Sequence, residues 1–587
     1  DGEIKPLFAG VFAIFGHGNV CGLGEALYHQ QEALPTYRGH NEQSMAHAAI
    51  AYAKANNRQR MMACTSSIGP GATNMVTAAA LAHVNRIPVL LLPGEVFVSR
   101  TPDPVLQQVE CPSDPTISAN DCFRPVSRYF DRISRPEHLL TALPRAMAAM
   151  TDPADCGPVT LAFCQDVQAE AYDWPESFFE PRTWHQRRIR PDLGELEKVA
   201  AILKTAQNPV LVAGGGIHYS DAFDALQAFV EKHQIPIVET QAGKSALPFD
   251  HPLNFGPVGV TGASSANDLC EAADVVLGVG TRFQDFTTGS WGLFKNPDRK
   301  LISLNVAAYD AMKHGAVPLQ SDAQTGLADL SSALEDYVAN APDQAGKDAW
   351  FAAVDPLTAA PETANALPTD MQVVGAVQRA AGPDTAVMCA AGTMPGELHK
   401  LWKSGRPGSY HMEYGFSTMG YEVAGAMGIK MADPDRDVIC MVGDGSYMMM
   451  NSELATAVMM GIKITIVITD NRGYGCINRL QMATGGANFN NLLDDSYHVT
   501  PSNIDFVAHA ASMGATAVKA TDIASLETAL QTAKTATGPF VVVIDTDPIP
   551  STPDGGTWWD VAVPEVSERD AVNSARIAYE KAVKDRD

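Results

Sequence analysis

Long apolar runs, a cleavable leader and an initiating methionine are all missing from this sequence. No apolar stretch reaches the length of about 20 residues that a membrane-spanning helix needs. A positively charged start followed by an apolar segment is also missing, so the cytoplasm is the predicted location. The chain begins at Asp1, close to a strand-like apolar segment at residues 11–15, and we therefore expect further residues before Asp1.

Positive charge is scarce as well. The chain has 67 Asp and Glu residues against 42 Lys and Arg residues, which gives a formal net charge of −25. Because binding to nucleic-acid phosphates needs a basic surface, nucleic acid is excluded as a predicted partner. The content of 46% hydrophobic and 19% charged residues is typical of a soluble globular protein, and no membrane partner is predicted.

Paired cysteines are a third absence. The sequence has ten cysteines, and no two of them are spaced as Cys-x-x-Cys. Most lie in apolar segments, which favours buried, reduced thiols. Neither a disulfide framework nor a zinc site is therefore predicted.

The chain of 587 residues is too long for one hydrophobic core. Apolar segments of strand length alternate with helical patterns, which indicates parallel sheets flanked by helices. We predict an α/β protein with three doubly wound parallel-sheet domains, of which the first and third look like a duplicated pair. The predicted bounds are 1–173 for the first domain, 174–191 for a linker, 192–340 for the central domain, 341–368 for a second linker, 369–555 for the third domain and 556–587 for a helical extension.

One pattern in the third domain indicates a metal site. Residues 443–445 (Gly-Asp-Gly) follow an apolar strand, and Asn471 and Gly473 follow the next one. The carboxyl ends of neighbouring parallel strands meet at one edge of the sheet, where ligands usually bind. The oxygens of Asp444, Asn471 and Gly473 suit Mg²⁺, and the helix that follows favours a phosphate at its start. The alternative is ordinary turn chemistry, because Gly-Asp-Gly and Asp-Asn are common in turns.

This pattern resembles the diphosphate-anchoring motif of thiamine-diphosphate enzymes. The sequence departs from that motif at Asp470, where an Asn is common, but keeps Asn471. The resemblance implies a pyrimidine-binding first domain, a central domain and a diphosphate-binding third domain. It assigns diphosphate or Mg²⁺ contacts to Gly443, Asp444, Gly445, Ser446, Asn471 and Gly473.

The same resemblance requires a glutamate in the first domain that exchanges a proton with the pyrimidine ring of the cofactor. The segment "RGHNEQS" supplies Glu42 and is similar to the "HEQ" segment of acetolactate synthases. Alone, Glu42 would be a helix-cap residue; beside the other matches it is predicted to be catalytic. In this family the glutamate comes from a neighbouring subunit, which implies a homodimer or homotetramer with shared active sites.

Three more residues are assigned to the cofactor by resemblance. Met419 lies in "GFSTMG", which is similar to "GLGTMG" of acetolactate synthases, and would support the bent cofactor; Met more often fills a core. Gly392 and Thr393 follow a strand and would meet the diphosphate or pyrimidine side. The segment "VGTRFQDFTTG" is similar to an FAD-contacting one, but "LNVAAYDAMK" departs from that pattern, so FAD stays open. The predicted cofactors are thiamine diphosphate and Mg²⁺.

Segments outside the shared motifs indicate a subfamily. "FAIFGHGNVCGLGEAL", "VETQAGKS" and "DNRGYGCINRLQM" are most similar to the ring-opening hydrolases of inositol catabolism. That resemblance implies a hydrolase that cleaves the bond between the two carbonyls of a trihydroxylated cyclohexane-1,2-dione. The product would be 5-deoxy-glucuronate, and the small-molecule partner is a cyclic polyol dione.

Such a reaction needs a proton donor and a base that activates water. His17, in the turn "FGHGN" after a strand, is predicted for these roles, since histidine titrates near neutral pH; the alternative is a hydrogen-bonded loop histidine. Asn19 is predicted to bind substrate hydroxyls. Of Gln107 and Gln108 in "PVLQQVE", Gln108 is favoured as the catalytic or substrate-binding residue that faces the cleft.

Three other residues near these motifs are weaker candidates. His40 and His47 flank Glu42, and burial in a helix explains His47 equally well. Cys476 follows the metal loop and is predicted to be a packing residue.

Two alternative functions share parts of this evidence. An acetolactate-synthase-like carboligase or a 2-oxoacid decarboxylase would use the same Glu42, Asp444 and Asn471. A nucleotide-binding oxidoreductase is suggested by three glycines at 214–216, but their spacing is not Gly-x-Gly-x-x-Gly.

Overall fold

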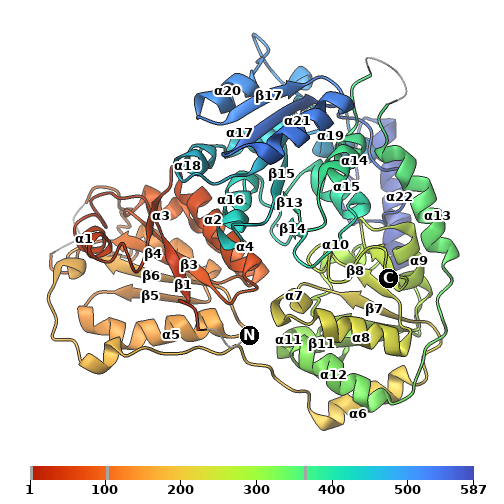
Figure 1. Ribbon diagram of the computed structural model, residues 1–587, viewed down its shortest axis with the longest axis horizontal. Helices are drawn as coiled ribbons and strands as arrows, with labels where there is room; N and C mark the ends of the chain where they lie inside the picture. Colours follow the sequence, from red (N-terminus) through yellow and green to blue (C-terminus); the bar gives the residue numbers. More distant parts are fainter. Residues whose placement is uncertain (1–3, 101–104, 362–365, 587) are drawn as a thin grey trace. The chain divides into compact units, whose positions relative to one another are not determined.

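The computed structural model of the protein describes residues 4–100, 105–361 and 366–586 (Figure 1). The chain forms two compact units. The first unit comprises residues 1–187 together with 415–435 and 450–464, and the second comprises 188–414, 436–449 and 465–587. In the described residues, no helix is both long and apolar enough to cross a membrane.

Three parallel six-stranded sheets flanked by helices form the fold, which confirms the predicted class. The strands of the first sheet are β1 (Phe8–Ala13), β2 (Thr36–Arg38), β3 (Met61–Ser66), β4 (Val89–Glu95), β5 (Tyr129–Ile133) and β6 (Pro158–Cys164). Those of the second are β7 (Pro209–Ala213), β8 (Ile237–Glu239), β9 (Asn254–Pro257), β10 (Val275–Val279), β11 (Lys300–Asn305) and β12 (Val317–Gln320). Those of the third are β13 (Ala386–Cys389), β14 (Tyr410–Met412), β15 (Val438–Gly443), β16 (Thr465–Asp470), β17 (Thr516–Ala520) and β18 (Phe540–Asp545).

The strand order locates the places where ligands would bind. The first sheet has the order β2-β1-β3-β4-β6-β5, and the third repeats it as β14-β13-β15-β16-β18-β17, as expected of a duplicated pair. The strand order changes direction between β1 and β3, and again between β13 and β15. In a doubly wound sheet the crevice beyond the carboxyl ends of those two strands is the usual binding site. His17 follows β1, and Asp444 directly follows β15.

The central strands are apolar on both faces because helices cover them. All six residues of β3 and all five of β7 are buried, which is typical of parallel strands inside an α/β domain. The longer helices are α1 (Gly22–His29), α2 (Glu42–Ala55), α4 (Val76–Asn85), α5 (Leu139–Thr151), α6 (Leu193–Leu203), α8 (Phe223–His233), α9 (Ser264–Ala272), α12 (Ala323–Leu334), α13 (Ala345–Val354), α14 (Asp370–Ala380), α15 (Thr393–Leu401), α16 (Glu422–Ala432), α19 (Gly475–Ala483), α21 (Ile523–Thr535) and α22 (Asp570–Arg586). Shorter helices that carry or flank site residues are α3 (Pro70–Asn74), α7 (Gly216–Ser220), α17 (Asp444–Met449), α18 (Glu453–Met459) and α20 (Phe506–Ser512).

Small residues bring α2 close to a helix from the later part of the chain. Within the first unit α16 packs on α2, and a Cβ added at Gly428 would lie 2.2 Å from the main-chain oxygen of Ala48. Glycine and alanine thus allow backbone-to-backbone contact that larger side chains would prevent.

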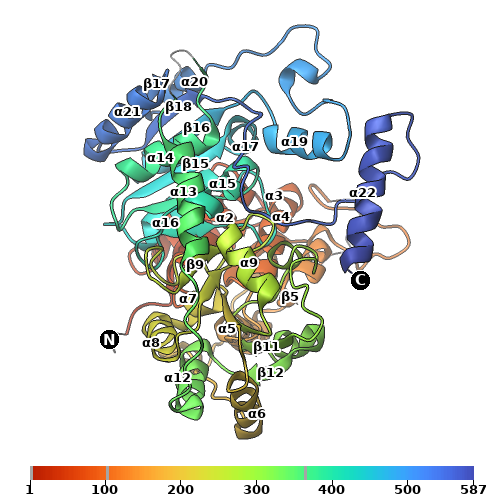
Figure 2. The same cartoon turned by 90° about the vertical axis from the view of Figure 1, so that its right-hand side faces the viewer.

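The C-terminal helix α22 is anchored to the segment beyond the predicted metal loop. A Cβ added at Gly485, which follows α19, would lie 2.4 Å from the main-chain oxygen of Ala571 in α22 (Figure 2). Gly485 has a φ of +81°, so this contact combines a left-handed turn with close backbone packing.

Candidate active site

Glu42 is held in a defined orientation at the start of α2. Asn41 caps the helix by accepting hydrogen bonds from the main-chain N–H groups of Gln43 and Ser44. The side-chain amide of Asn74 donates to Oε2 of Glu42 at 2.8 Å, and a Cβ at Gly71 would lie 3.1 Å from Oε1. The half-buried carboxyl group of Glu42 therefore has one fixed donor and a neighbour without a side chain. We call Glu42, Asn74 and Gly71 the Glu42 cluster.

Asn74 belongs to this cluster although sequence reasoning did not assign it a role. It lies in the "GPGATN" turn that joins β3 to α4. A signal was present, because the turn is glycine-rich and directly follows a buried strand. Only the folded chain shows that the amide of Asn74 reaches Glu42, 32 positions away in sequence.

The turn that carries His17 is built by Asn19. Oδ1 of Asn19 accepts from the N–H of Gly16 at 2.9 Å, and its amide donates to the main-chain oxygen of Ile14 and to Oγ1 of Thr65. Asn19 is 1% exposed, whereas His17 is exposed. The buried amide of Asn19 therefore holds the turn, and His17 faces solvent; binding of substrate hydroxyls by Asn19 stays a prediction.

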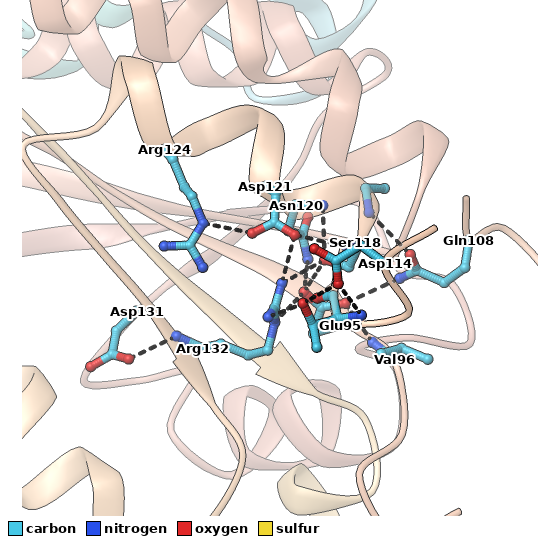
Figure 3. Close-up of polar contacts among 12 residues, drawn as sticks. Glu95, Val96, Gln108, Asp114, Ser118, Asn120, Asp121, Arg124, Asp131 and Arg132 are labelled. Carbon is cyan, nitrogen blue, oxygen red and sulfur yellow. Dashed lines mark hydrogen bonds and ion pairs between the residues drawn. The ribbon is translucent and has the colours of Figure 1, made fainter. Parts of the chain in front are cut away.

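Gln108 is likewise engaged within the protein (Figure 3). Its amide nitrogen donates to Oε1 of Glu95 at 3.2 Å, and its oxygen accepts from the N–H of Ala119 at 3.2 Å. The carboxylate of Glu95 is fully buried and also binds Ser118 and Arg132, through Oε2 at 2.7 and 3.1 Å. Both ends of the Gln108 amide therefore anchor this network, and its contact with substrate stays a prediction.

Gln107 is the glutamine that points toward the His17 turn. It is exposed and has a φ of +64°, the left-handed conformation. Its Oε1 accepts from the hydroxyl of Ser67 at 3.4 Å, and that hydroxyl accepts from the N–H of Gly18 at 3.4 Å. These contacts favour Gln107 over Gln108 for the side of the His17 turn, and the substrate-binding role stays a prediction.

The two glutamines are expected to differ in what they contribute to stability. Q108L should lower the free energy of unfolding by about 1–3 kcal/mol, because it removes one of the two donors to Oε1 of the buried Glu95 carboxylate, the other being the N–H of Val96, and takes away the acceptor of the Ala119 N–H. Q107L should change it by less than about 0.5 kcal/mol, as surface substitutions usually do. Urea unfolding followed by circular dichroism measures both. Equal losses of stability in the two variants would contradict this assignment.

Asp444 lies at the start of α17, directly after β15. Its Oδ2 accepts from the N–H of Gly473 at 2.9 Å and its Oδ1 from the N–H of Asn471 at 3.4 Å. Burial raises the pKa of the Asp444 carboxyl to about 7, and the nearby carboxylate of Asp470 adds to this. A bound divalent cation has the opposite effect, because it favours the ionised carboxylate.

Three oxygens converge beside Asp444. The side-chain oxygen of Asn471 lies 3.3 Å from Oδ1 of Asp444 and 2.9 Å from the main-chain oxygen of Gly473. Turning the amide over would place its nitrogen there as a donor to both oxygens. Without a cation, the nitrogen-inward orientation is the one that forms hydrogen bonds. An Asp carboxylate, an Asn amide oxygen and a main-chain carbonyl oxygen are nevertheless ligands of the kind that Mg²⁺ prefers, so these residues fit that ion. We call Asp444, Asn471 and Gly473 the Asp444 cluster.

Two glycines of this loop are required by close packing. Gly473 has a φ of +144°, and a Cβ there would lie 2.4 Å from the main-chain oxygen of Asn491. A Cβ at Gly445 would lie 2.5 Å from the ring of Tyr474. The loop therefore closes tightly around the Asp444 cluster.

The other residues assigned to the cofactor lie at strand ends or in loops. Gly392 precedes α15 with a φ of +91°, and open space surrounds the position of its Cβ, as it does at Gly443. Ser446 is buried in α17. Thr393 begins α15, and its side chain lies outside the described part of the structure. Met419 is half-buried in the stretch 415–435, which belongs to the first unit.

The three weaker candidates, His40, His47 and Cys476, have packing or anchoring contacts in the structure. The ring of His40 is held between Arg38 and Thr456, at 3.2 and 2.8 Å. Burial lowers the pKa of His47 to about 3, so this histidine is neutral, and it packs edge-on against Tyr421. Burial raises the pKa of the half-buried Cys476 thiol, which agrees with packing.

The glycines at 214–216 in the central domain pack directly against the main chain of a neighbouring segment. The N–H of Gly216 donates to the main-chain oxygen of Gly280 at 3.0 Å, and a Cβ at Gly214 would lie 2.4 Å from that same oxygen. These glycines let the ends of β7 and β10 touch. They consequently give no support to the nucleotide-binding oxidoreductase alternative.

Comparison with known proteins places both clusters in matched domains. The sequence matches the thiamine pyrophosphate enzyme family in three stretches: the N-terminal TPP binding domain at 9–113, the central domain at 196–330 and the C-terminal TPP binding domain at 390–544. The chain belongs to the thiamine pyrophosphate enzyme family. This membership confirms the expected cofactor, thiamine diphosphate.

Curated relatives of this thiamine pyrophosphate enzyme are similar over nearly their full length. A protein of Geobacillus thermodenitrificans named 3D-(3,5/4)-trihydroxycyclohexane-1,2-dione hydrolase is 44% identical over 98% of this chain and 94% of its own length. Proteins of the same name from Bacillus cereus and Bacillus thuringiensis are 43% and 42% identical, over 99% of this chain and 95% of their own lengths.

Within this thiamine pyrophosphate enzyme, the Glu42 cluster and the His17 turn lie in the N-terminal TPP binding domain. The Asp444 cluster lies in the C-terminal TPP binding domain. The groups predicted to handle protons and those predicted to hold metal and diphosphate therefore come from different TPP-binding domains.

Proposed function

We propose that this protein hydrolyses the carbon–carbon bond between the two carbonyls of 3D-(3,5/4)-trihydroxycyclohexane-1,2-dione, opening the ring to 5-deoxy-D-glucuronate in myo-inositol degradation. The observation that carries the proposal is the 44% identity, over 98% of the chain, to a hydrolase named for this substrate. The two clusters support the proposal, because they supply the groups that a thiamine-diphosphate enzyme needs.

When bound, thiamine diphosphate would supply a carbon nucleophile for one carbonyl of the dione, and its ring would take up the electron pair released when that carbon separates from the other carbonyl, to which water has added and which becomes the carboxylic acid. In our proposal Glu42 exchanges a proton with the pyrimidine ring at its carboxyl oxygen. The hydrogen bond from Asn74 fixes Oε2, so Oε1 beside Gly71 is the oxygen free to make that contact.

The Asp444 cluster would bind the metal and the diphosphate. The oxygens of Asp444, Asn471 and Gly473 offer three ligands to Mg²⁺, and phosphate oxygens commonly complete such a site. Gly443, Gly445, Ser446, Gly392 and Thr393 stay assigned to the surroundings of the diphosphate, and Met419 stays assigned to the support of the cofactor.

His17 is proposed as the group that moves protons on the substrate side. Its turn is rigid because Asn19 binds both Gly16 and Thr65, yet its ring is exposed. A histidine so placed can activate the water that adds to the second carbonyl and then, after cleavage, protonate the carbon that retains the electron pair. Gln107, linked to the same turn through Ser67, takes the substrate-binding role first assigned to Gln108.

The proposal includes a homodimer or homotetramer in which Glu42 of one copy serves the cofactor held by Asp444 of another. The cytoplasmic location expected from the sequence stays a prediction.

The substrate is tested by incubating the protein with thiamine diphosphate and Mg²⁺ and with either the trihydroxycyclohexane-dione or pyruvate. We expect ring opening, measured as release of the product acid by NMR, and at least about 100-fold less turnover of pyruvate. A sample stripped of metal with EDTA serves as the control and should lose activity. Consumption of pyruvate without ring opening would favour the carboligase or decarboxylase alternative instead.

A further inference from the structure

A carboxylate that no motif identified contacts the main chain immediately before Glu42. Glu453, the first residue of α18, accepts hydrogen bonds on Oε1 from the N–H groups of His40 and Asn41, both at 3.0 Å. Helices α18 and α2 both belong to the first unit, and α18 lies next to α2 (Figure 1). The contact joins residues separated by 413 and 412 positions in the sequence.

The environment of Glu453 is costly for a carboxylate. The residue is 1% exposed, and its Oε2 is a buried acceptor without a hydrogen-bond donor among the described residues. Burying a charged group with half its acceptors unused opposes folding, so stability alone does not account for a glutamate here. The hydrogen bonds that Oε1 accepts from the main chain before Glu42 are therefore the contacts that a glutamate is needed for at this position.

The hydrogen bonds fix the backbone on both sides of Glu42. The carboxylate of Glu453 accepts hydrogen bonds from the N–H groups of His40 and Asn41. The side chain of Asn41 in turn accepts hydrogen bonds from the N–H groups of Gln43 and Ser44. Glu42 lies between these two pairs. Its Cα position is therefore set by α18 through Asn41, while Asn74 sets the orientation of its carboxyl group.

A second contact between the same segments supports this arrangement. Nδ1 of His40 lies 2.8 Å from the hydroxyl of Thr456, one helical turn beyond Glu453. The segment before α2 is thus bound to α18 by both main chain and side chain.

We propose that Glu453 is a positioning residue for Glu42. It does not reach the reacting atoms; it holds the first turn of α2 so that the carboxyl group of Glu42 meets the cofactor ring at the right distance. This inference rests on the proposed function, because the role of Glu42 does. A displacement of about 1 Å at a reacting group can lower a rate by about 100-fold, so the effect is measurable.

The central test is a double-mutant cycle between Glu453 and Glu42. E453L removes the acceptor at similar side-chain volume and should lower kcat for the dione by about 30-fold, with KM changed less than about threefold. In an E42Q background the same change should lower kcat by less than about twofold, because there is no catalytic carboxyl group left to position. E453Q keeps an acceptor oxygen and should recover most of the rate.

Hydrogen–deuterium exchange on the protein without cofactor provides a readout independent of turnover. E453L should raise exchange in the peptide that covers residues 38–44 by at least about tenfold and leave β3 and β4 protected. D152A is the matched control, because Asp152 also accepts two main-chain N–H groups in the first unit, from Ala154 and Asp155. Asp152 lies before β6, at the amino end of the sheet, and D152A should keep kcat within about twofold.

The outcomes separate this inference from the proposed function. Equal losses of kcat on adding E453L to the parent and to E42Q would overturn the positioning role, as would loss of protection throughout the first unit. If E42Q itself turns over like the parent, the assigned role of Glu42 fails first.

Discussion

Replacing Asp444 with alanine is expected to abolish binding of Mg²⁺ and thiamine diphosphate together. The carboxylate supplies one of three converging oxygens. It also accepts hydrogen bonds from the main-chain N–H groups of Asn471 and Gly473, which hold those two residues in place. Its loss removes a ligand and loosens the other two, so affinity for the cofactor should fall at least about 100-fold. Turnover should fall at least about 1000-fold, since the cofactor carries out the chemistry.

Isothermal titration with thiamine diphosphate at fixed Mg²⁺ measures the affinity. D545A is a suitable control, because Asp545 ends β18, the strand next to β16, but is exposed and pairs with Lys519. An exposed pair contributes little, so D545A should bind the cofactor like the parent. Parent-like affinity in D444A would show that the metal is held elsewhere.

Replacing Glu42 with glutamine is expected to lower kcat by about 100- to 10,000-fold while the protein keeps its fold and its cofactor. The amide has the same shape and can accept the hydrogen bond from Asn74, but it cannot exchange a proton with the cofactor ring. The measurement is steady-state turnover of the dione together with the affinity for thiamine diphosphate, which should change less than about tenfold.

E25Q is the matched control for Glu42. Glu25 is also an acidic residue in the first turn of a helix of the first unit, so both substitutions remove the same favourable interaction with the helix dipole. E25Q should therefore lose no activity. If E42Q and E25Q behave alike, the carboxyl group of Glu42 is not catalytic.

The Asp444 cluster could be predicted from the sequence because its parts end two consecutive strands of one parallel sheet. The alternation of strand and helix predicts that such ends share an edge, and the oxygen-bearing residue types predict the ligand. Glu42 could be proposed only through resemblance, since a glutamate in the first turn of a helix is ordinary. The sheet order, the same in the first and third domains, could not be derived from alternation.

Side-chain roles inside the site depended on the fold. Adjacent residues such as Gln107 and Gln108 have the same chemistry, and only their contacts in the folded chain distinguish them: Gln107 binds Ser67, whereas Gln108 binds Glu95 and the main chain. The amide of Asn19 has the hydrogen-bonding groups of a substrate ligand, but it is buried and hydrogen-bonded within the turn.

By itself, the sequence determined the fold class and the cofactor family and predicted the metal loop, because strand–helix alternation and short contiguous motifs at strand ends encode them. Only the tertiary structure decided which groups orient Glu42. Asn74 and Glu453 are separated from it in sequence, and their contacts depend on how helices from distant parts of the chain pack on α2. Hydrogen-bond geometry is set to within a few tenths of an ångström by that packing, and no local pattern of residues specifies it.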